Sequence, residues 1–333
     1  MVSPLPSTIG GAPVSALRVV VRPRWMYEIQ RLVEPDKPFA GVVFAEHLVA
    51  MVAVDSPTAA RTLTEQDIRD AGGRFSDVLE LALRQMRRPT QADFIKLGDG
   101  VFRSLQGDFY TSSWPLFPEV FESLGLRGKP LIVVASRQSV FVTASDEPQG
   151  TDDIMKYAAQ IFSQELPIST RIYRLDGHGW RTWTPTIPRP ETPIAELFES
   201  LDQVDYATAI GGTHEHIQRI VGDQVSVVQL SVVPNINSRY VTLAFWLPDG
   251  GPALVPEAER VALLKATGDS AGADVVVIVT WETLTSVLGT KLQPDGRYPQ
   301  RFLWNSSLTD DDWQRLQDAP AADLKAIRAP GTE

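Results

Sequence analysis

The His214-Glu215-His216 triplet is the one cluster in the sequence with residue types suited to ligating a metal ion. Zinc enzymes often use two histidines at helical spacing together with a carboxylate. A separation of two residues places both rings on one face of a strand, but it gives about 200° of rotation on a helix. Because the preceding Gly211-Gly212-Thr213 is typical of a helix N-cap, we expect a helix and diverging rings. The corresponding chemistry is a metal-dependent hydrolase built on His214, His216 and the carboxylate of Glu215 or Asp223.

Arginines form a second cluster of chemical interest. Arg84, Arg87 and Arg88 end a predicted helix over Ser76–Arg88 and form a hypothetical anion-binding or partner-binding site together with Arg22 and Arg24. The simpler interpretation is structural, because cations in the last turn of a helix interact favourably with its dipole. Both interpretations stay open at the level of the sequence.

Aromatic and histidine side chains near residue 180 suggest a surface for a partner. Trp180 and Trp183 are predicted to share one strand face and to anchor another protein, or else to pack the seam between modules. His178 lies between two glycines and is expected in a turn, as is His47 between two strands. Neither histidine needs a chemical role to explain its position.

Several classes of mechanism are excluded by the sequence. The chain has no cysteine, so disulfides, thiolate nucleophiles and cysteine-ligated zinc or iron–sulfur centres are ruled out. No nucleophile elbow and no phosphate-binding glycine loop occurs. Runs of aspartate at 152–153 and 310–312 are explained by predicted helix starts, where negative charge is stabilising. No cofactor is therefore expected.

Composition indicates an acidic globular protein. The 333 residues include 31 Lys and Arg against 41 Asp and Glu, a formal net charge of −10, with 43% hydrophobic residues. Nucleic-acid binding usually requires a basic face, so we expect none here, whereas a basic protein partner suits the acidic charge. No run approaches the roughly 20 apolar residues that span a bilayer, so no membrane insertion is expected. The N-terminus lacks the pattern of a signal peptide, which favours a cytoplasmic location.

The elements that would position these residues predict an α+β chain of two modules with mixed, largely antiparallel sheets. Residues 1–15 are expected to be a flexible N-terminus, followed by a module over 16–184. Four prolines within Pro185–Pro193 predict a linker, and 194–333 form the second module. A strand-turn-strand-helix-strand order in Leu131–Leu175 recurs in Val225–Thr280, which suggests a diverged pair of ββαβ units.

Local patterns predict further elements. Thr64-Glu65-Gln66-Asp67 is typical of a capping box before a short helix, and Ile194–Leu201 and Trp281–Leu288 are predicted to be helices. A helix is predicted over Pro256–Thr267, with proline at its start. The run Asp274–Thr280 is apolar throughout and is predicted to be a central strand of a sheet. Thr309 is predicted to cap a last helix at Trp313–Gln317.

Residues 48–183 contain a characteristic order of segments, which span Leu48 to Trp183 and have the sequences LVAMVAVD, RTLTEQDI, LELALRQMRR, DFYTSSWPL, PLIVVASRQSVFVTASDE and RIYRLDGHGWRTW. In this order of segments the region resembles the YtpQ-like family of uncharacterised bacterial proteins. The resemblance implies a cytosolic bacterial α+β protein and assigns no catalytic residue. Residues 191–333 lie outside the resemblance and form an added module.

The charge, the missing motifs and the weak candidate sites together lead to three hypotheses for the function. The leading hypothesis is a non-enzymatic cytosolic protein-binding adaptor, regulator or neutralising partner of another protein, because no set of catalytic groups converges in the sequence. The first alternative is the metal-dependent hydrolase that uses His214 and His216. The second is a small-molecule or nucleotide sensor with its site in the cleft between the modules. The sequence leaves the oligomeric state open.

Overall fold

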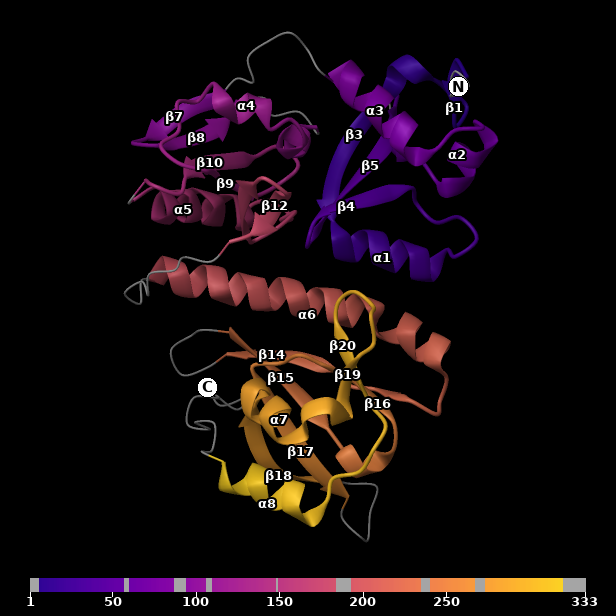
Figure 1. The fold of residues 1–333 in the computed structure, drawn as a ribbon, viewed down its shortest axis with the longest axis vertical. Coiled ribbons are helices and arrows are strands. Elements are labelled where there is room, and N and C mark those ends of the chain that lie inside the picture. The colour runs from indigo at the N-terminus through magenta and orange to yellow at the C-terminus, as the bar shows by residue number, and fades with distance from the viewer. Residues whose placement is uncertain are drawn as a thin grey trace. The chain divides into compact units, whose positions relative to one another are not determined.

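The protein is described by a computed structural model, which covers residues 6–56, 60–86, 94–105, 110–147, 149–183, 193–234, 240–266 and 273–319. The chain divides into two compact units, Met1–Phe198 and Glu199–Glu333. Helices accompany several mostly antiparallel sheets (Figure 1), which confirms the predicted α+β class. The predicted linker lies outside the described residues except for Pro193, at which a long helix begins.

The first sheet of unit 1 is antiparallel and has the strand order β3-β5-β4. Its central strand is apolar and buried along almost its whole length, as expected for a strand covered on both faces. Thr64 forms the predicted capping box with Asp67 at the start of a helix. The elements are β3 (Leu17–Pro23), α1 (Arg24–Val33), β4 (Gly41–Ala45), β5 (Leu48–Asp55), β6 (Ala60–Thr62), α2 (Glu65–Asp70) and α3 (Phe75–Met86).

A hairpin of β1 (Thr8–Ile9) and β2 (Ala12–Pro13), followed by a short 3-10 helix at Val14–Ala16, precedes this sheet. Ile9 is 1% exposed and belongs to the core formed by the sheet with α2 and α3. The expectation of a flexible N-terminus over 1–15 is therefore wrong for the hairpin, because an apolar side chain fixes it to the core.

The second sheet of unit 1 has six strands in the order β12-β11-β9-β10-β8-β7. One face packs against α5, and the other, which includes Trp180, packs against Phe121 and against residues of the first sheet. The expected strand-strand-helix-strand unit is present as β9, β10, α5 and β11. The elements are β7 (Phe94–Gly98), β8 (Val101–Ser104), the 3-10 helix η2 (Thr111–Leu116), α4 (Glu119–Glu122), β9 (Pro130–Val134), β10 (Val140–Ala144), α5 (Gly150–Phe162), β11 (Ile172–Asp176) and β12 (Gly179–Thr182).

Unit 2 contains two four-stranded sheets, with the orders β13-β16-β20-β19 and β14-β15-β17-β18. Most neighbours are antiparallel, but β13 pairs with β16, and β15 with β17, in parallel. The elements are α6 (Pro193–Val221), β13 (Ser226–Val227), β14 (Leu230–Pro234), β15 (Tyr240–Trp246), the 3-10 helix Pro248–Gly250, β16 (Ala253–Pro256), β17 (Arg260–Ala266), β18 (Ala273–Thr280), α7 (Trp281–Leu288), the 3-10 helix Gly289–Lys291, β19 (Leu292–Pro294), β20 (Arg301–Trp304) and α8 (Asp310–Asp318).

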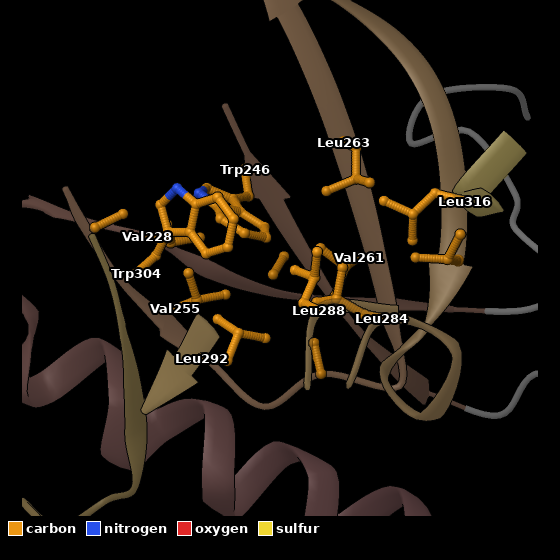
Figure 2. Close-up of a cluster of buried hydrophobic side chains, with 14 of the residues drawn as sticks. Val228, Trp246, Val255, Val261, Leu263, Leu284, Leu288, Leu292, Trp304 and Leu316 are labelled. Atoms are coloured by element: carbon orange, nitrogen blue, oxygen red, sulfur yellow. The ribbon is translucent and has the colours of Figure 1, made fainter. Parts of the chain in front are cut away.

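One core joins these two sheets with α7 and α8 (Figure 2). Trp246 and Trp304 lie at its centre with ring centroids 5.1 Å apart in an edge-to-face arrangement. The indole N–H of Trp304 donates to the carbonyl of Pro248 at 3.0 Å, so its polar atom is satisfied inside the core. Truncation of a buried tryptophan to alanine typically costs about 3–5 kcal/mol, which makes this pair central to the stability of unit 2.

Three expectations for the sheets of unit 2 are wrong. The segment predicted as a helix over Pro256–Thr267 forms the end of β16 and the strand β17, which is central in its sheet. The second ββαβ unit consequently does not exist, because a strand replaces its helix. The run predicted as a central strand is β18, which lies at the edge of the sheet and pairs only with β17.

Helix α6 is longer than expected and continues through Gly211-Gly212, which the sequence indicated as a helix start. This part of the helix packs against the rest of unit 2 through a stripe of buried residues at helical spacing, Ile210, Thr213 and Ile217. The predicted N-cap at Thr213 is therefore wrong. Tertiary packing outweighs the cost of about 1 kcal/mol that each interior glycine imposes on a helix.

Candidate functional surfaces

His214 and His216 lie on the same helix, so their rings point to different sides of α6. The Nδ1 atom of His216 lies 3.1 Å from an Nη atom of Arg219, on the exposed side. Nδ1 of His214 is buried and has no hydrogen-bond partner in the described part of the chain. Burial and the nearby charge of Arg301 lower the pKa of His214, against a smaller opposing effect of Glu215.

No three histidine, aspartate or glutamate side chains come together as a metal site within the described residues. Glu215 and Asp223 are both exposed, and Asp223 follows the end of α6. Among these residues there is thus no third ligand for the metal ion of the hypothetical hydrolase. The imidazoles of His214 and His216 also diverge, so they do not face one shared site.

Arg301 is a fully buried cation, with 0% of the residue exposed. Its guanidinium donates to the carbonyl of Ile210 at 3.0 Å, to the hydroxyl of Thr213 at 2.7 Å and to the carbonyl of Pro299 at 3.3 Å. Burial lowers the pKa of Arg301 to about 10, although nearby Tyr206 and Asp295 raise it. These bonds attach β20 to the middle of α6, so we assign Arg301 a structural role.

The predicted arginine site does not form a single cluster of available cations. Arg84 pairs with Glu80, and Arg24 pairs with Glu28 at 3.1 Å, each one helical turn away. Arg22 is half-buried on β3, and burial together with the charge of Arg137 lowers its pKa to about 10. Arg87 and Arg88 lie outside the described residues. Arg84 lies in the last turn of α3, which agrees with the structural interpretation, whereas Arg24 is the first residue of α1 and is held by its ion pair with Glu28.

Trp180 and Trp183 lie on opposite faces of the six-stranded sheet, because three positions along a strand is an odd separation. Trp180 is 6% exposed, packs edge-to-face on Phe121 and donates its indole N–H to the carbonyl of Pro115 at 2.6 Å. Trp183 is partly buried against the core that includes α5. The prediction of a shared face is therefore wrong, and Trp180 is a core residue.

The other two histidines lie in turns, as expected. His47 belongs to the turn between β4 and β5 and His178 to the turn between β11 and β12. Burial lowers the pKa of His47 to about 3, and the charges of Arg171 and Arg24 add to this effect. His47 therefore stays neutral at physiological pH and contributes no charge to a site.

The edge of the first sheet in unit 1 is protected by side chains. The hydroxyl of Ser113 donates to the carbonyl of Val19 at 2.8 Å, and Ser112 lies similarly beside Val21 at 3.5 Å. The backbone N–H of Val19 lies 3.0 Å from the sulfur of Met86. The backbone groups of β3 that point away from β5 are thus covered, which prevents another strand from pairing there.

The edge formed by β18 has no such protection. At eight residues it is the longest edge strand among the described elements. On the side away from β17, its backbone N–H and C=O groups have no hydrogen-bond partner among the described residues. Other edges are shorter or modified: β14 ends in proline, and β7 contains an irregularity between Lys96 and Gly98. The one irregularity of β18 is a bulge at Val276, which leaves Val277–Thr280 in regular register with β17.

The sheet face beside this edge is apolar on its outer side. Phe245, Ala262 and Ile278 are aligned across β15, β17 and β18, and Leu264 is aligned with Val275. Phe245 is 47% exposed and Val275 is 50% exposed, Leu264 and Ile278 are partly buried, and Ala262 between Phe245 and Ile278 is fully buried. None of these five residues belongs to a core cluster of the described residues. We call this set the outer apolar patch. An exposed apolar patch next to an open strand edge is typical of an interaction site.

Acidic side chains lie on β18 and on the helix that contacts it. Helix α8 contacts β18 and contains four aspartates against one arginine. Thr309 caps this helix as predicted, and Asp312 in its first turn accepts a hydrogen bond from Lys291 at 2.6 Å. Asp310 and Asp311 are exposed, as is Asp274 on β18. The neighbouring strand β17 carries two cations, Arg260 and Lys265, and Lys265 is aligned with Asp274. Strands β17 and β18 and helix α8 together carry five acidic residues against three cations, so acidic charge is in excess there.

Sequence reasoning missed this surface because it assigned β18 to the interior of a sheet. The signal was present, since the run ADVVVIVT has the composition of a strand covered on both faces. The apolar pattern indicates that β18 is suited to having a strand on each side. It does not show whether both of those strands come from this chain.

Comparison with protein-family models, with curated proteins and with solved structures found no match to this chain. The resemblance to the YtpQ-like family stays a prediction from the sequence. Among the described helices, none is both long and apolar enough to cross a membrane.

Proposed function

We propose that this chain is a non-enzymatic protein-binding protein of the cytoplasm, which acts as an adaptor, regulator or neutralising partner of another protein. The observation that carries the proposal is the open edge of β18 beside the outer apolar patch. Native proteins normally cover or modify such an edge, as β3 is covered in unit 1. An edge left open next to exposed Phe245 and Val275 is explained by a partner that covers it.

The net charge of the chain supports a basic partner. A formal charge of −10 attracts cationic proteins and accelerates their association at low ionic strength. The acidic helix α8 contacts β18, so the long-range attraction and the apolar contact would act on the same part of unit 2.

The proposal is tested by crosslinked pulldown from the source cytosol with three proteins: the unchanged chain, Val275→Lys and Val33→Lys. Val275 and Val33 are 50% and 49% exposed, so the two variants place the same charge at equally exposed sites in different units. We expect one or more partners to be captured by the unchanged chain and by Val33→Lys but not by Val275→Lys. Recovery of the bait alone by all three proteins would contradict a protein-binding function.

A further inference from the structure

We infer that the partner binds to β18 as an added β-strand, contributed by an extended segment with alternating apolar residues and with lysine or arginine at its ends. This inference rests on the proposed function and adds the mode of binding and the chemistry of the partner.

The backbone of β18 determines the mode in which the partner binds. In a strand, alternate residues direct their N–H and C=O groups toward opposite edges, so the pairing with β17 uses only half of them. The other half has no hydrogen-bond partner among the described residues. Val277–Thr280, the regular part beyond the bulge, is paired with Arg260–Leu263 and is held rigidly by that strand. It therefore presents a template on which an extended chain can form a ladder.

The side chains beside the edge determine the sequence of the segment. In an added strand, every second side chain lies on the outer face next to Ile278 and Val275. Val275 adjoins Leu264 on β17 and is 50% exposed, and Ile278 adjoins Ala262, so an apolar side chain beside Val275 buries surface that is now exposed. Valine, isoleucine and aromatic residues suit both this contact and the extended conformation.

The charge around β18 determines what flanks the segment and argues against a second copy of this chain. Strand β18 contains one acidic residue and no cation, and α8, which contacts it, contains four aspartates and one arginine. Strand β17 adds Arg260 and Lys265, which leaves an excess of two acidic residues on these three elements. Two copies paired edge to edge would bring these like charges together, which is destabilising. Lysine or arginine on either side of an apolar segment would instead be attracted by Asp310 and Asp311, both exposed.

The probe is a short synthetic peptide of alternating valine and threonine with lysines at both ends, titrated into the full chain. A peptide with proline at its centre and one with glutamates in place of the lysines are the controls. Binding is measured by fluorescence anisotropy, and hydrogen exchange of the protein reports which backbone amides become protected. We expect the lysine peptide to bind and to protect amides of Val277–Thr280, and both controls to bind at least about tenfold more weakly, which corresponds to about 1.4 kcal/mol.

Variants provide a second measurement. Val275→Lys should weaken binding of the lysine peptide by about tenfold or more, whereas Val33→Lys should leave it unchanged. Equal binding of the proline peptide, or protection confined to unit 1, would overturn strand addition. If the peptide fails to bind while the pulldown partner is still lost with Val275→Lys, strand addition is wrong and the proposed function stands. The exchange measurement on the unchanged chain needs no variant, so it decides the question even if a variant misfolds.

Discussion

Two glycines of α6 should respond in opposite ways to the same substitution. Gly211 lies inside the helix on its exposed side, and a Cβ added there meets no atom within 4 Å. Gly222 follows the last residue of the helix with φ of +74°, and its N–H donates to the carbonyl of Gln218 at 2.9 Å. A Cβ at Gly222 also meets no atom within 4 Å, so only backbone conformation distinguishes the two sites.

The expected magnitudes follow from that difference. Alanine is about 1 kcal/mol more favourable than glycine inside a helix, so Gly211→Ala should stabilise unit 2 by about that amount. A left-handed conformation costs a residue with a Cβ about 1–2 kcal/mol, which exceeds the gain of about 0.4–1 kcal/mol from a stiffer unfolded chain. Gly222→Ala should therefore destabilise unit 2 by about 1 kcal/mol. The two variants should differ by about 2 kcal/mol.

Urea unfolding followed by tryptophan fluorescence measures both effects. Trp246 and Trp304 lie in the core of unit 2 and report its loss. The urea concentrations at the unfolding midpoints of the two variants should move in opposite directions. The slope of the unfolding free energy against urea concentration should stay unchanged, which indicates a change in stability alone. If Gly211→Ala lowers the midpoint, the assignment of a continuous exposed helix through residue 211 is refuted. A rise in the midpoint for Gly222→Ala would refute the left-handed ending of α6.

Three further outcomes are expected from the contacts described above. Burial of Asp312 raises its pKa, but hydrogen bonds from Lys291 and Thr309 outweigh burial and hold it at about 2 rather than 3.8. Its contribution to stability is therefore complete above pH 3.8 and is lost as the pH falls toward 2, so Lys291→Met should reduce the acid sensitivity seen in urea titrations. Arg301→Ala should lower the free energy of unfolding by about 3–5 kcal/mol, because it leaves a cavity and unpaired acceptors. Arg301→Met fills the space without a charge, so its loss of stability, measured by thermal unfolding, should be smaller by at least about 2 kcal/mol. Ser113→Ala should destabilise unit 1 by about 1–3 kcal/mol in the same assay, since it leaves the buried carbonyl of Val19 unpaired, and an unchanged transition would contradict the capped edge of β3.

Local signals in the sequence predicted the elements that local chemistry determines. The capping boxes at Thr64 and Thr309 are confirmed, as is the helix Trp281–Leu288. Each depends on residues within one or two helical turns, and no distant contact competes with them.

Errors occur where distant contacts decide the structure. In β17 the run Val261–Leu264 is apolar on both faces of the sheet, so it lacks the alternation that marks a strand, and the proline before it resembles a helix start. In α6 the glycines at 211 and 212 indicate a break, but packing of Ile210 and Ile217 keeps the helix continuous. The candidate surface was missed for the same reason. The apolar run of β18 is evident in the sequence, whereas its position at an edge depends on the pairing of the whole sheet.

The open edge of β18 also has a consequence for how the isolated protein behaves in concentrated solution. Colloidal stability then depends on mutual repulsion between molecules that each carry a formal charge of −10. That repulsion vanishes near the isoelectric point of about 5.0 and is screened within about 10 Å at 0.1 M salt. Mild acid or high salt should therefore promote strand-to-strand aggregation through unit 2 while both units are still folded, and Val275→Lys should raise the concentration at which light scattering begins.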